Sequence, residues 1–378
     1  MNGVKYNMVD MYVTSQKIQD ILDKSYLDTG KEKNFEDVVI ELYNQNDYVT
    51  IKPVLPEESF WDCLSDDEFL DLLNQIPVCI NTILENRSIM KSSDFRESVI
   101  LREQSDIFVN KHFNYINDPP HYHDYFEIYY VFKGNCGFQF EKDYRNLEEG
   151  ELCIIAPTSL HNIILDNKDS IIISIAIRKS TFDNTFFTML SQKDLLSYFF
   201  KSILYNKTSP NYLLFHTENS KDIKIIIKNL IIENNKVDMY SNNCSISWAN
   251  LLFSTILRKH GNTVQFNKYD IGTDFSLIVQ YIQNNYKTLT LSTLAEYFHY
   301  SEAHLSVLIK KNLGLKFTTL LTNLKMEDAK EYLLNTDLPI EKVSEYAGYN
   351  SVEHFSRTFK RYFKKSPQQY RKSPENTF

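Results

Sequence analysis

The sequence predicts an α+β chain of several domains, in which a small β barrel or sandwich precedes an all-α module. Residues 98–178 hold short runs rich in Ile, Val, Phe and Tyr, separated by Gly and Pro, which is the pattern of an antiparallel β domain. On both sides of this stretch the apolar residues return to helical spacing. After residue 275, a helix, a tight turn and a basic helix occur twice. A chain of 378 residues is long enough for two or three domains.

The charge of the chain is unevenly distributed, which bears on its partners. The net charge of −8 at pH 7 would by itself argue against a nucleic-acid-binding protein. From Phe275 to Phe378, however, 14 Lys and Arg residues stand against 10 Asp and Glu residues, so this segment carries +4 and the rest of the chain −12. The basic residues therefore favour the C-terminal module as the part that contacts nucleic acid.

The cysteines and the apolar runs predict a cytoplasmic protein. The cysteine count is odd and no pair has C-x-x-C spacing, which predicts free thiols in a reducing compartment. No apolar run approaches 18 residues and the first residues lack the apolar centre of a signal peptide, so we expect no membrane span. High Asn, Ile, Lys and Tyr with only nine Gly suggests an AT-rich bacterial genome. The cysteines are Cys63, Cys79, Cys136, Cys153 and Cys244.

Residues 1–95 are expected to form a helical N-terminal extension. Residues 34–45 have the pattern of a short helix. Residues 59–90 show apolar residues at helical spacing, and Pro77 is expected to kink or divide this segment. The extension would either pack on the next domain or bind a partner.

Residues 96–179 are expected to form the β domain. Within it, His121, His123 and Glu127 have the same parity, so an extended strand places their side chains on one face. Tyr125 and Tyr129 share that parity, and the later strand at 160–165 contains His161. The expected strands lie in the runs 98–116, 126–132, 136–148, 152–157, 160–165 and 170–177.

This pattern resembles the double motif of the cupin family. The resemblance implies a small jelly-roll barrel with the His and Glu side chains pointing into its mouth. The first half of the motif fits fully, whereas two spacings in the second half each differ by one residue. The residues that carry the resemblance are His121, His123, Glu127 and Gly134, followed by Gly150, Pro157 and His161.

Three imidazoles and one carboxylate are suited to iron, manganese, zinc or nickel, and a cupin enzyme would need such a metal. Regulators often retain the motif as the polar wall of a pocket. We therefore predict a site for a small molecule, with a sugar as one candidate, and no metal or cofactor. The nearby aromatic residues would stack on the ligand or form plain barrel core. The predicted ligand-binding residues are His121, His123, Tyr125, Glu127, Tyr129 and His161.

Residues 180–261 are expected to form a helical dimerisation segment. Within 243–259 an apolar stripe includes Ala249, Leu252 and Phe253 at helical spacing. The stripe would pair with a second copy or close the open face of the barrel, and we favour a homodimer because two-fold symmetry matches paired DNA half-sites. Residues 262–274 are polar and aperiodic, and are expected to be a linker.

Residues 275–378 are expected to hold two helix-turn-helix units. The first turn lies at 299–301, where Ser301 is suited to cap the second helix, and the second lies at 348–350, where Ser351 is suited to the same role. A long helix predicted at 317–334 joins the units and is ended by residues 336–339, which include a proline. In such a unit the second helix enters the major groove of DNA.

The exposed faces of the two second helices are predicted to contact DNA. Lys and Arg side chains would neutralise phosphates. The residues better suited to base edges are Arg357, Ser306, Glu353 and His354. An ordinary helical bundle with two solvated faces is the alternative. The predicted DNA-binding residues are Ser301, His304, Ser306, Val307, Lys310, Lys311, Asn350, Ser351, Glu353, His354, Ser356, Arg357, Lys360 and Arg361.

The last quarter of the chain resembles the AraC/XylS transcription regulators, most closely over A-G-Y-N-S-V-E-H-F-S-R-T-F-K-R-Y-F and S-P-Q-Q-Y-R. The resemblance implies two recognition helices that enter successive major-groove segments. Sugar-sensing members of the family carry a cupin-like domain, so the two resemblances support each other. This chain departs from the family at Val307, where Arg is frequent, and at Lys364, where Gly is frequent.

The sequence therefore predicts a non-enzymatic transcription regulator that binds double-stranded DNA and is controlled by a small molecule in the cupin-like barrel. Two alternatives stay open. One is a metal-dependent cupin enzyme, and the other is a regulator whose input is a protein or a change of temperature. No catalytic triad, phosphate-binding loop or kinase motif favours catalysis.

Overall fold

The chain divides into two compact units in the computed structural model. The first comprises Met1–Met189 with Asn206–Asn267, and the second comprises Leu190–Tyr205 with Lys268–Phe378. Cys63, residues 266–273 of the expected linker and the stretch 190–211 lie outside the described residues. Within the described part, no helix is long and apolar enough to cross a bilayer. The structure describes residues 10–53, 55, 64–85, 94–101, 104–116, 119–189, 212–236, 238–265 and 274–372.

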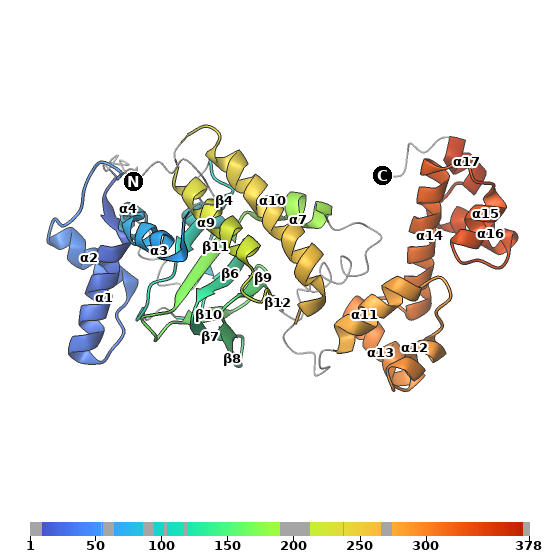
Figure 1. Cartoon of the computed structure of the whole chain (residues 1–378), viewed down its shortest axis with the longest axis horizontal. Coiled ribbons are helices and arrows are strands. Elements are labelled where there is room, and N and C mark those ends of the chain that lie inside the picture. The colour runs from blue at the N-terminus through green and yellow to red at the C-terminus, as the bar shows by residue number, and fades with distance from the viewer. Residues whose placement is uncertain are drawn as a thin grey trace, which may run out of the picture. The chain divides into compact units, whose positions relative to one another are not determined.

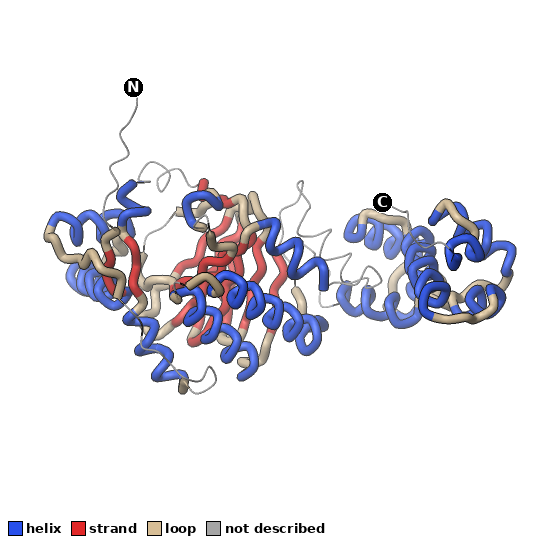
Figure 2. The backbone as a smooth tube through the Cα atoms, turned by 90° about the horizontal axis from the view of Figure 1, so that it is seen from above, coloured by secondary structure: helices blue, strands red, loops and turns tan. Residues whose placement is uncertain are grey.

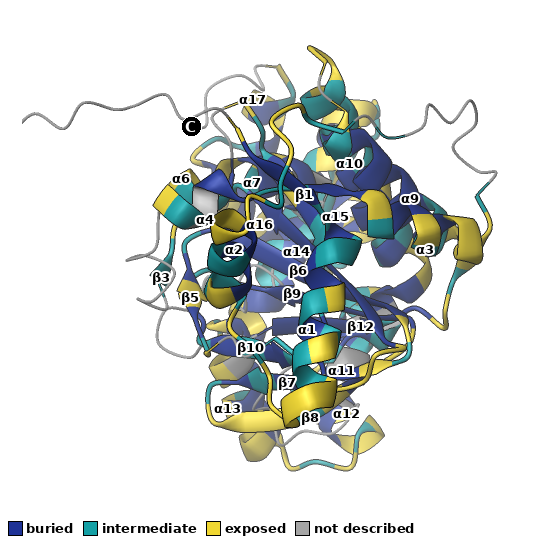
Figure 3. Ribbon diagram, turned by 90° about the vertical axis from the view of Figure 1, so that its left-hand side faces the viewer, coloured by how far each residue is buried: buried dark blue, intermediate teal, exposed yellow. Residues whose placement is uncertain are grey.

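The N-terminal residues form small helices around one core, as expected. Ile18, Leu22 and Val38 are fully or almost fully buried there, and Phe113 from the β domain packs against the same cluster. Residues 59–63 and 86–90 of the predicted 59–90 helix lie outside the described residues. Within the rest, Pro77 divides the segment, because it begins a strand that pairs with Tyr12–Thr14. Figure 3 shows these helices with exposed outer surfaces. The elements are β1 (Tyr12–Thr14), α1 (Ser15–Thr29), α2 (Phe35–Asn44), α3 (Asp66–Gln75), β2 (Pro77–Cys79) and α4 (Asn81–Glu85).

Two antiparallel sheets form the β domain, which confirms the predicted β-rich architecture. One sheet has the strand order β12-β9-β6-β11-β4 and the other β10-β7-β8. Between them lies an apolar core that includes Tyr129, Phe138 and Leu147. The strands are β4 (Ile107–Lys111), β6 (Phe126–Lys133), β7 (Asn135–Phe140), β8 (Asp143–Glu148), β9 (Glu151–Ile155), β10 (His161–Ile164), β11 (Ile171–Ile177) and β12 (Tyr212–His216).

Helices α7 (Lys179–Met189), α9 (Lys221–Asn235) and α10 (Ser241–His260) cover the outer face of the larger sheet (Figures 1 and 2). Phe126 of β6 stacks on Phe182 of α7 with ring centroids 3.8 Å apart. The apolar stripe of α10 is buried, and Phe253 contacts Phe182 and Phe186. The stripe therefore belongs to the core of the first unit, and a homodimer remains a prediction that needs another surface.

Three local expectations are wrong. The run 98–101 was expected in a strand, but helix α6 (Glu97–Ile100) forms there, since Asp124 accepts a hydrogen bond from the Glu97 amide that begins it. Residues 212–216 were placed in the helical segment, but they form the buried edge strand β12 against β9. The predicted linker begins later than residue 262, because Gln265 pairs with Leu214 through two backbone hydrogen bonds.

Between residues 274 and 372, the described part of the second unit, the regular elements are all helices, and they match the predicted boundaries closely. Ser301 and Ser351 both act as N-caps, accepting from the His304 and His354 amides at 3.2 and 3.3 Å. The long predicted helix ends at Asn335, just before the proline-containing segment. The helices are α11 (Asp274–Asn285), α12 (Leu291–Tyr297), α13 (Glu302–Leu313), α14 (Phe317–Asn335), α15 (Ile340–Tyr346), α16 (Val352–Phe363) and α17 (Pro367–Lys372).

Gly348 lies where the turn of the second helix-turn-helix unit touches the first. Its φ of +80° is in the left-handed region, and an added Cβ would lie 2.6 Å from the carbonyl oxygen of Lys287, in the turn after α11. The Lys325 ammonium donates to the Gly348 carbonyl, and Lys287 pairs with Asp328 of α14 at 3.0 Å. The two halves of the unit therefore meet at a position that has no room for a side chain.

We expect Gly348→Ala to lower the opening free energy of α15 and α16 by roughly 2–4 kcal/mol, since a left-handed alanine costs about 1–2 kcal/mol before any clash. Gly314→Ala is the matched control, because Gly314 has a φ of +68° but an added Cβ would meet nothing within 4 Å. Hydrogen exchange of the α13, α15 and α16 amides in the full chain measures both. Equal losses in the two variants would contradict the close approach at Gly348.

Candidate functional site

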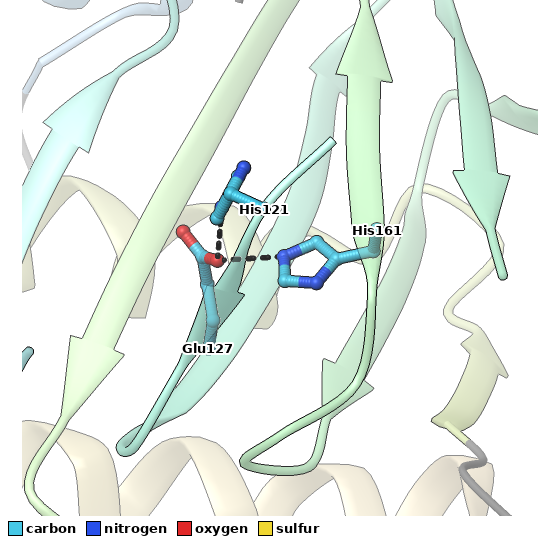
Figure 4. Close-up of side chains that lie close together, drawn as sticks. All are labelled: His121, Glu127 and His161. Carbon is cyan, nitrogen blue, oxygen red and sulfur yellow. Dashed lines mark hydrogen bonds and ion pairs between the residues drawn. The ribbon is translucent and has the colours of Figure 1, made fainter. Parts of the chain in front are cut away.

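The histidine and glutamate side chains of the predicted motif come together inside the β domain. Figure 4 shows His121, Glu127 and His161 converging from three segments of the chain. His121 and His161 exchange backbone hydrogen bonds of 3.0 and 3.1 Å, which holds the start of β10 beside the segment before β5 (Tyr122–His123). Glu127 lies near the start of β6, and all of these side chains are buried.

Glu127 is the centre of this cluster. Its Oε2 atom lies 3.2 Å from Nε2 of His123, 3.1 Å from Nε2 of His161 and 3.9 Å from Nε2 of His121. The Tyr129 hydroxyl donates to the same oxygen at 3.0 Å, and the Ser174 hydroxyl donates to Oε1 at 2.6 Å. A buried carboxylate is costly unless it is paired, and here each oxygen has donors or imidazoles around it.

The imidazole orientations are fixed by backbone carbonyls. Nδ1 of His123 lies 2.8 Å from the carbonyl oxygen of Tyr125, and Nδ1 of His161 lies 2.9 Å from that of Ser159. Because a carbonyl oxygen only accepts, each Nδ1 atom carries a proton. An Nε2 atom that also donates to Glu127 would make its ring an imidazolium, whereas a neutral ring would point an Nε2 lone pair at the carboxylate, which repels it unless a cation lies between them.

The pKa shifts show opposite tendencies for the carboxylate and an imidazole of the cluster. Burial alone would raise the pKa of Glu127, but hydrogen bonds with the three histidines outweigh burial and hold that pKa well below its usual value. Burial lowers the pKa of His161, and its contact with Glu127 offsets this only in part. The Glu127 carboxylate is therefore ionised at neutral pH, and burial opposes a positive charge on His161.

This donor set fits a transition-metal ion. One ligand atom from each of His121, Glu127 and His161 lies within 4.8 Å of the others. Imidazole nitrogens with one carboxylate suit zinc, iron, nickel and manganese. Histidine ligands of metals commonly donate their second ring nitrogen to a carbonyl, as His123 and His161 do. The fit is better than the sequence alone indicated.

The predicted aromatic residues divide between two environments. Tyr129 bonds Glu127 and belongs to the inner core, where its ring lies 6.5 Å from that of Phe138. Tyr125 lies beside the cluster and stacks on His123 with ring centroids 4.3 Å apart. Phe126 faces the opposite side of the sheet.

Sequence reasoning missed Ser174 and His112. Ser174 is the single hydroxyl residue within the apolar strand β11. It lies two residues after Ile172, which belongs to the inner core, so its side chain faces the same side of the sheet. A lone hydroxyl on an inward-facing position was the signal that could have identified it. The His112 ring lies 5.4 Å from that of Tyr129, and burial lowers its pKa to about 4. Nothing in the local sequence distinguished His112 from a surface histidine.

A cavity of about 340 Å³ opens at another edge of the same core. Phe140 and Tyr212 form its aromatic wall, and Arg145 lies among them. The Arg145 guanidinium donates to the Tyr212 hydroxyl at 3.3 Å and to the Gln265 side chain at 3.4 Å. Its buried Nε has no hydrogen-bond partner within the described part of the chain. The cavity therefore offers aromatic faces and an arginine side chain.

The second candidate site is the outer surface of α13 and α16. The residues that face inward, such as Leu305 and Phe355, are fully buried, so the opposite face is free for a partner. Lys310, Lys311 and Arg357 are exposed and form no ion pair with any residue that the structure describes. The other predicted DNA-binding residues on these helices and their turns are exposed or half-buried, and none is fully buried.

The two recognition helices are equivalent, residue by residue, at a spacing of 50. Both begin with a capping serine and carry a histidine and a serine at the same positions. Both are followed by a residue in the left-handed region, Gly314 with φ +68° and Lys364 with φ +63°. Lys364 therefore occupies a position that ordinarily favours glycine, without breaking the pattern.

Two family matches agree with these two sites. Residues 294–373 match the family described as helix-turn-helix domain. Residues 110–197 match the family described as AraC-like ligand binding domain.

Known proteins resemble parts of the chain. Raffinose operon transcriptional regulatory protein RafR of Pediococcus pentosaceus is 29% identical over 187 residues, which is 49% of this chain and 61% of RafR. An uncharacterized HTH-type transcriptional regulator of Staphylococcus aureus (strain MSSA476) is 37% identical over 95 residues, which is 25% of this chain and 13% of that protein. The chain thus spans less than two thirds of either relative.

A solved structure resembles the second unit in sequence. It is the C-terminal domain of the two-component response regulator yesN from Fusobacterium nucleatum, with 36% identity. The match covers 26% of this chain and 99% of that chain, with a TM-score of 0.26. With a helix-turn-helix match over residues 294–373 and an AraC-like ligand-binding match over residues 110–197, this chain combines an AraC-type helix-turn-helix domain with an AraC-like ligand-binding domain.

Proposed function

We propose that the chain binds double-stranded DNA through α13 and α16, and that a small molecule bound in the β domain controls this binding. The observation that carries the proposal is the duplication of the recognition helix within one unit. Each copy buries its apolar face and leaves basic and polar side chains exposed. A duplicated basic helix after a tight turn is the arrangement that reads two major-groove segments.

The length of α14 supports simultaneous binding. Its 19 residues span about 28 Å at 1.5 Å per residue. One turn of B-form DNA is about 34 Å long, so a helix of this length is suited to separate two readers of successive major-groove segments. In Figure 1, α12 and α13 lie at one end of α14, and α15 and α16 lie toward the other end.

The β domain supplies the sensing part of the proposal. Its candidate positions are the Glu127 cluster and the cavity beside Arg145, both of which border the same aromatic core. Aromatic walls with a few polar groups are typical of sites for small organic molecules, including sugars. RafR, the relative from Pediococcus pentosaceus, is a raffinose operon transcriptional regulatory protein, which supports a sugar as one candidate effector. Control requires that the effector bind one arrangement of the chain better than the other.

A second candidate function is metal binding in the β domain. The observation that favours it is the convergence of imidazole nitrogens and a carboxylate oxygen, because a cation among them would relieve the repulsion between neutral imidazole lone pairs and the carboxylate. His121, His123, Glu127 and His161 would hold the ion, and a bound ion would supply Lewis acidity at the barrel interior. The protein residues would orient the ligands through the Tyr125 and Ser159 carbonyls.

Arg357→Ala tests the DNA-binding proposal. We expect its affinity for a duplex selected from a random pool to fall roughly 5- to 100-fold, the range for one lost bidentate base contact. Lys360→Ala should weaken binding to all sequences alike and reduce the salt slope by about one. Fluorescence anisotropy measures both. Arg258→Ala, an exposed arginine of α10, is the control and should bind like the wild type. Equal affinities for all four proteins would refute the proposed interface.

Glu127→Gln tests the metal candidate. We expect the wild-type chain, loaded with Zn²⁺ and dialysed against metal-free buffer, to retain about one ion per chain, and the variant to lose it, because an amide is a weaker ligand than a carboxylate. Glu149→Gln, at an exposed position, should retain the ion. Elemental analysis gives the ratio. A wild-type chain that retains no zinc, iron, nickel or manganese leaves the cluster as a metal-free pocket.

A further inference from the structure

The outward face of α13 carries an apolar side chain where a charged one is expected. Val307 is 66% exposed, although it lies in the middle of a helix whose other outward residues include His304, Lys310 and Lys311. Single exposed apolar residues are common, so exposure alone decides little. The position of Val307 is more informative than its exposure, because the outward face of this helix is the surface proposed to enter the major groove.

The equivalent position of the second recognition helix holds Arg357. One helical turn earlier on the same face, α13 has the exposed Ala303 where α16 has Glu353. Residues four apart lie on the same face of a helix. On this face α13 therefore carries two apolar residues, Ala303 and Val307, where α16 carries the charged residues Glu353 and Arg357. Between these positions His304 and Ser306 match their counterparts in α16, whereas the buried Leu305 corresponds to a phenylalanine. Other equivalent positions also differ, but Ala303 and Val307 are the exposed apolar residues of α13 at positions where α16 carries charged side chains.

These two pairs are suited to different groups on the base edges. A guanidinium suits the O6 and N7 acceptors of guanine, and a carboxylate accepts from the N4 amino group of cytosine. Methyl groups can neither donate nor accept a hydrogen bond. The apolar group that DNA presents in the major groove is the C5-methyl of thymine, and apolar side chains contact it.

We propose that Val307, with Ala303 beside it, reads thymine C5-methyl groups, whereas Arg357 reads guanine. The two half-sites of one chain are then chemically unlike, and the operator has a polarity that fixes which helix-turn-helix unit occupies which half. This inference rests on the proposed DNA binding through α13 and α16. It names the base group that the first unit recognises.

The test uses the full chain and duplexes selected from a random pool. In the selected site, thymines are replaced one at a time by deoxyuridine, which lacks only the C5-methyl. We expect one position, in the half not read by Arg357, to lose about three- to fourfold in affinity, the factor for one buried methyl group. Val307→Ala should bind but be indifferent to that replacement. Val307→Arg should shift the selected base at that position toward guanine.

Arg357→Ala is the matched variant for the other half. It should lose the guanine preference and keep the sensitivity to deoxyuridine. The inference is overturned if Val307→Ala shows the same deoxyuridine sensitivity as the wild type, or if no replacement changes wild-type affinity. Since Val307 is exposed, these variants are expected to fold, and unchanged helical circular dichroism checks this. If the random pool yields no enriched sequence, the proposed DNA binding itself is overturned. If a sequence is enriched but shows no sensitivity to deoxyuridine, only the inference about Val307 is overturned.

Discussion

The second unit depends on the burial of α14 against two groups of helices at once. Phe317 and Leu320 near its start are buried and α13 packs against this helix, whereas Ala329 and Leu333 belong to the core around α15 and α16. A single 19-residue helix therefore ties both recognition helices to one rigid axis. The close approach at Gly348 adds a second connection, so the spacing between the readers is set by packing inside the unit.

The β domain follows a different constraint, which is the cost of a buried carboxylate. Glu127 is stable there because the imidazoles and the Tyr129 and Ser174 hydroxyls surround it. The same arrangement makes the site responsive, since a cation or a hydrogen-bonding ligand would change the balance of charge in the barrel interior. Tyr129 links the cluster to the aromatic core that also borders the Arg145 cavity. A ligand at either position would therefore contact the same packed interior.

Much of this organisation could be predicted from the sequence, because local rules determine it. The serine caps, the turns and the buried stripes of the second unit follow from spacing alone, as Ser301 and Ser351 show. Residues 212–216 could not be placed, because a short apolar run suits a strand and a helix equally until its partner β9 is known. The stripe of α10 has the same ambiguity, since periodicity shows that a face is buried but not against which partner. Ser174 joined the Glu127 cluster only through long-range strand pairing.

The central claim is that one chain reads two successive major-groove segments. Hydroxyl-radical and methylation footprinting of the full chain on a selected duplex tests it most directly. The account predicts, for each bound chain, two protected segments on one face of the duplex, centred about one helical turn apart. A single protected segment, or two segments on opposite faces, would contradict the rigid two-reader arrangement around α14.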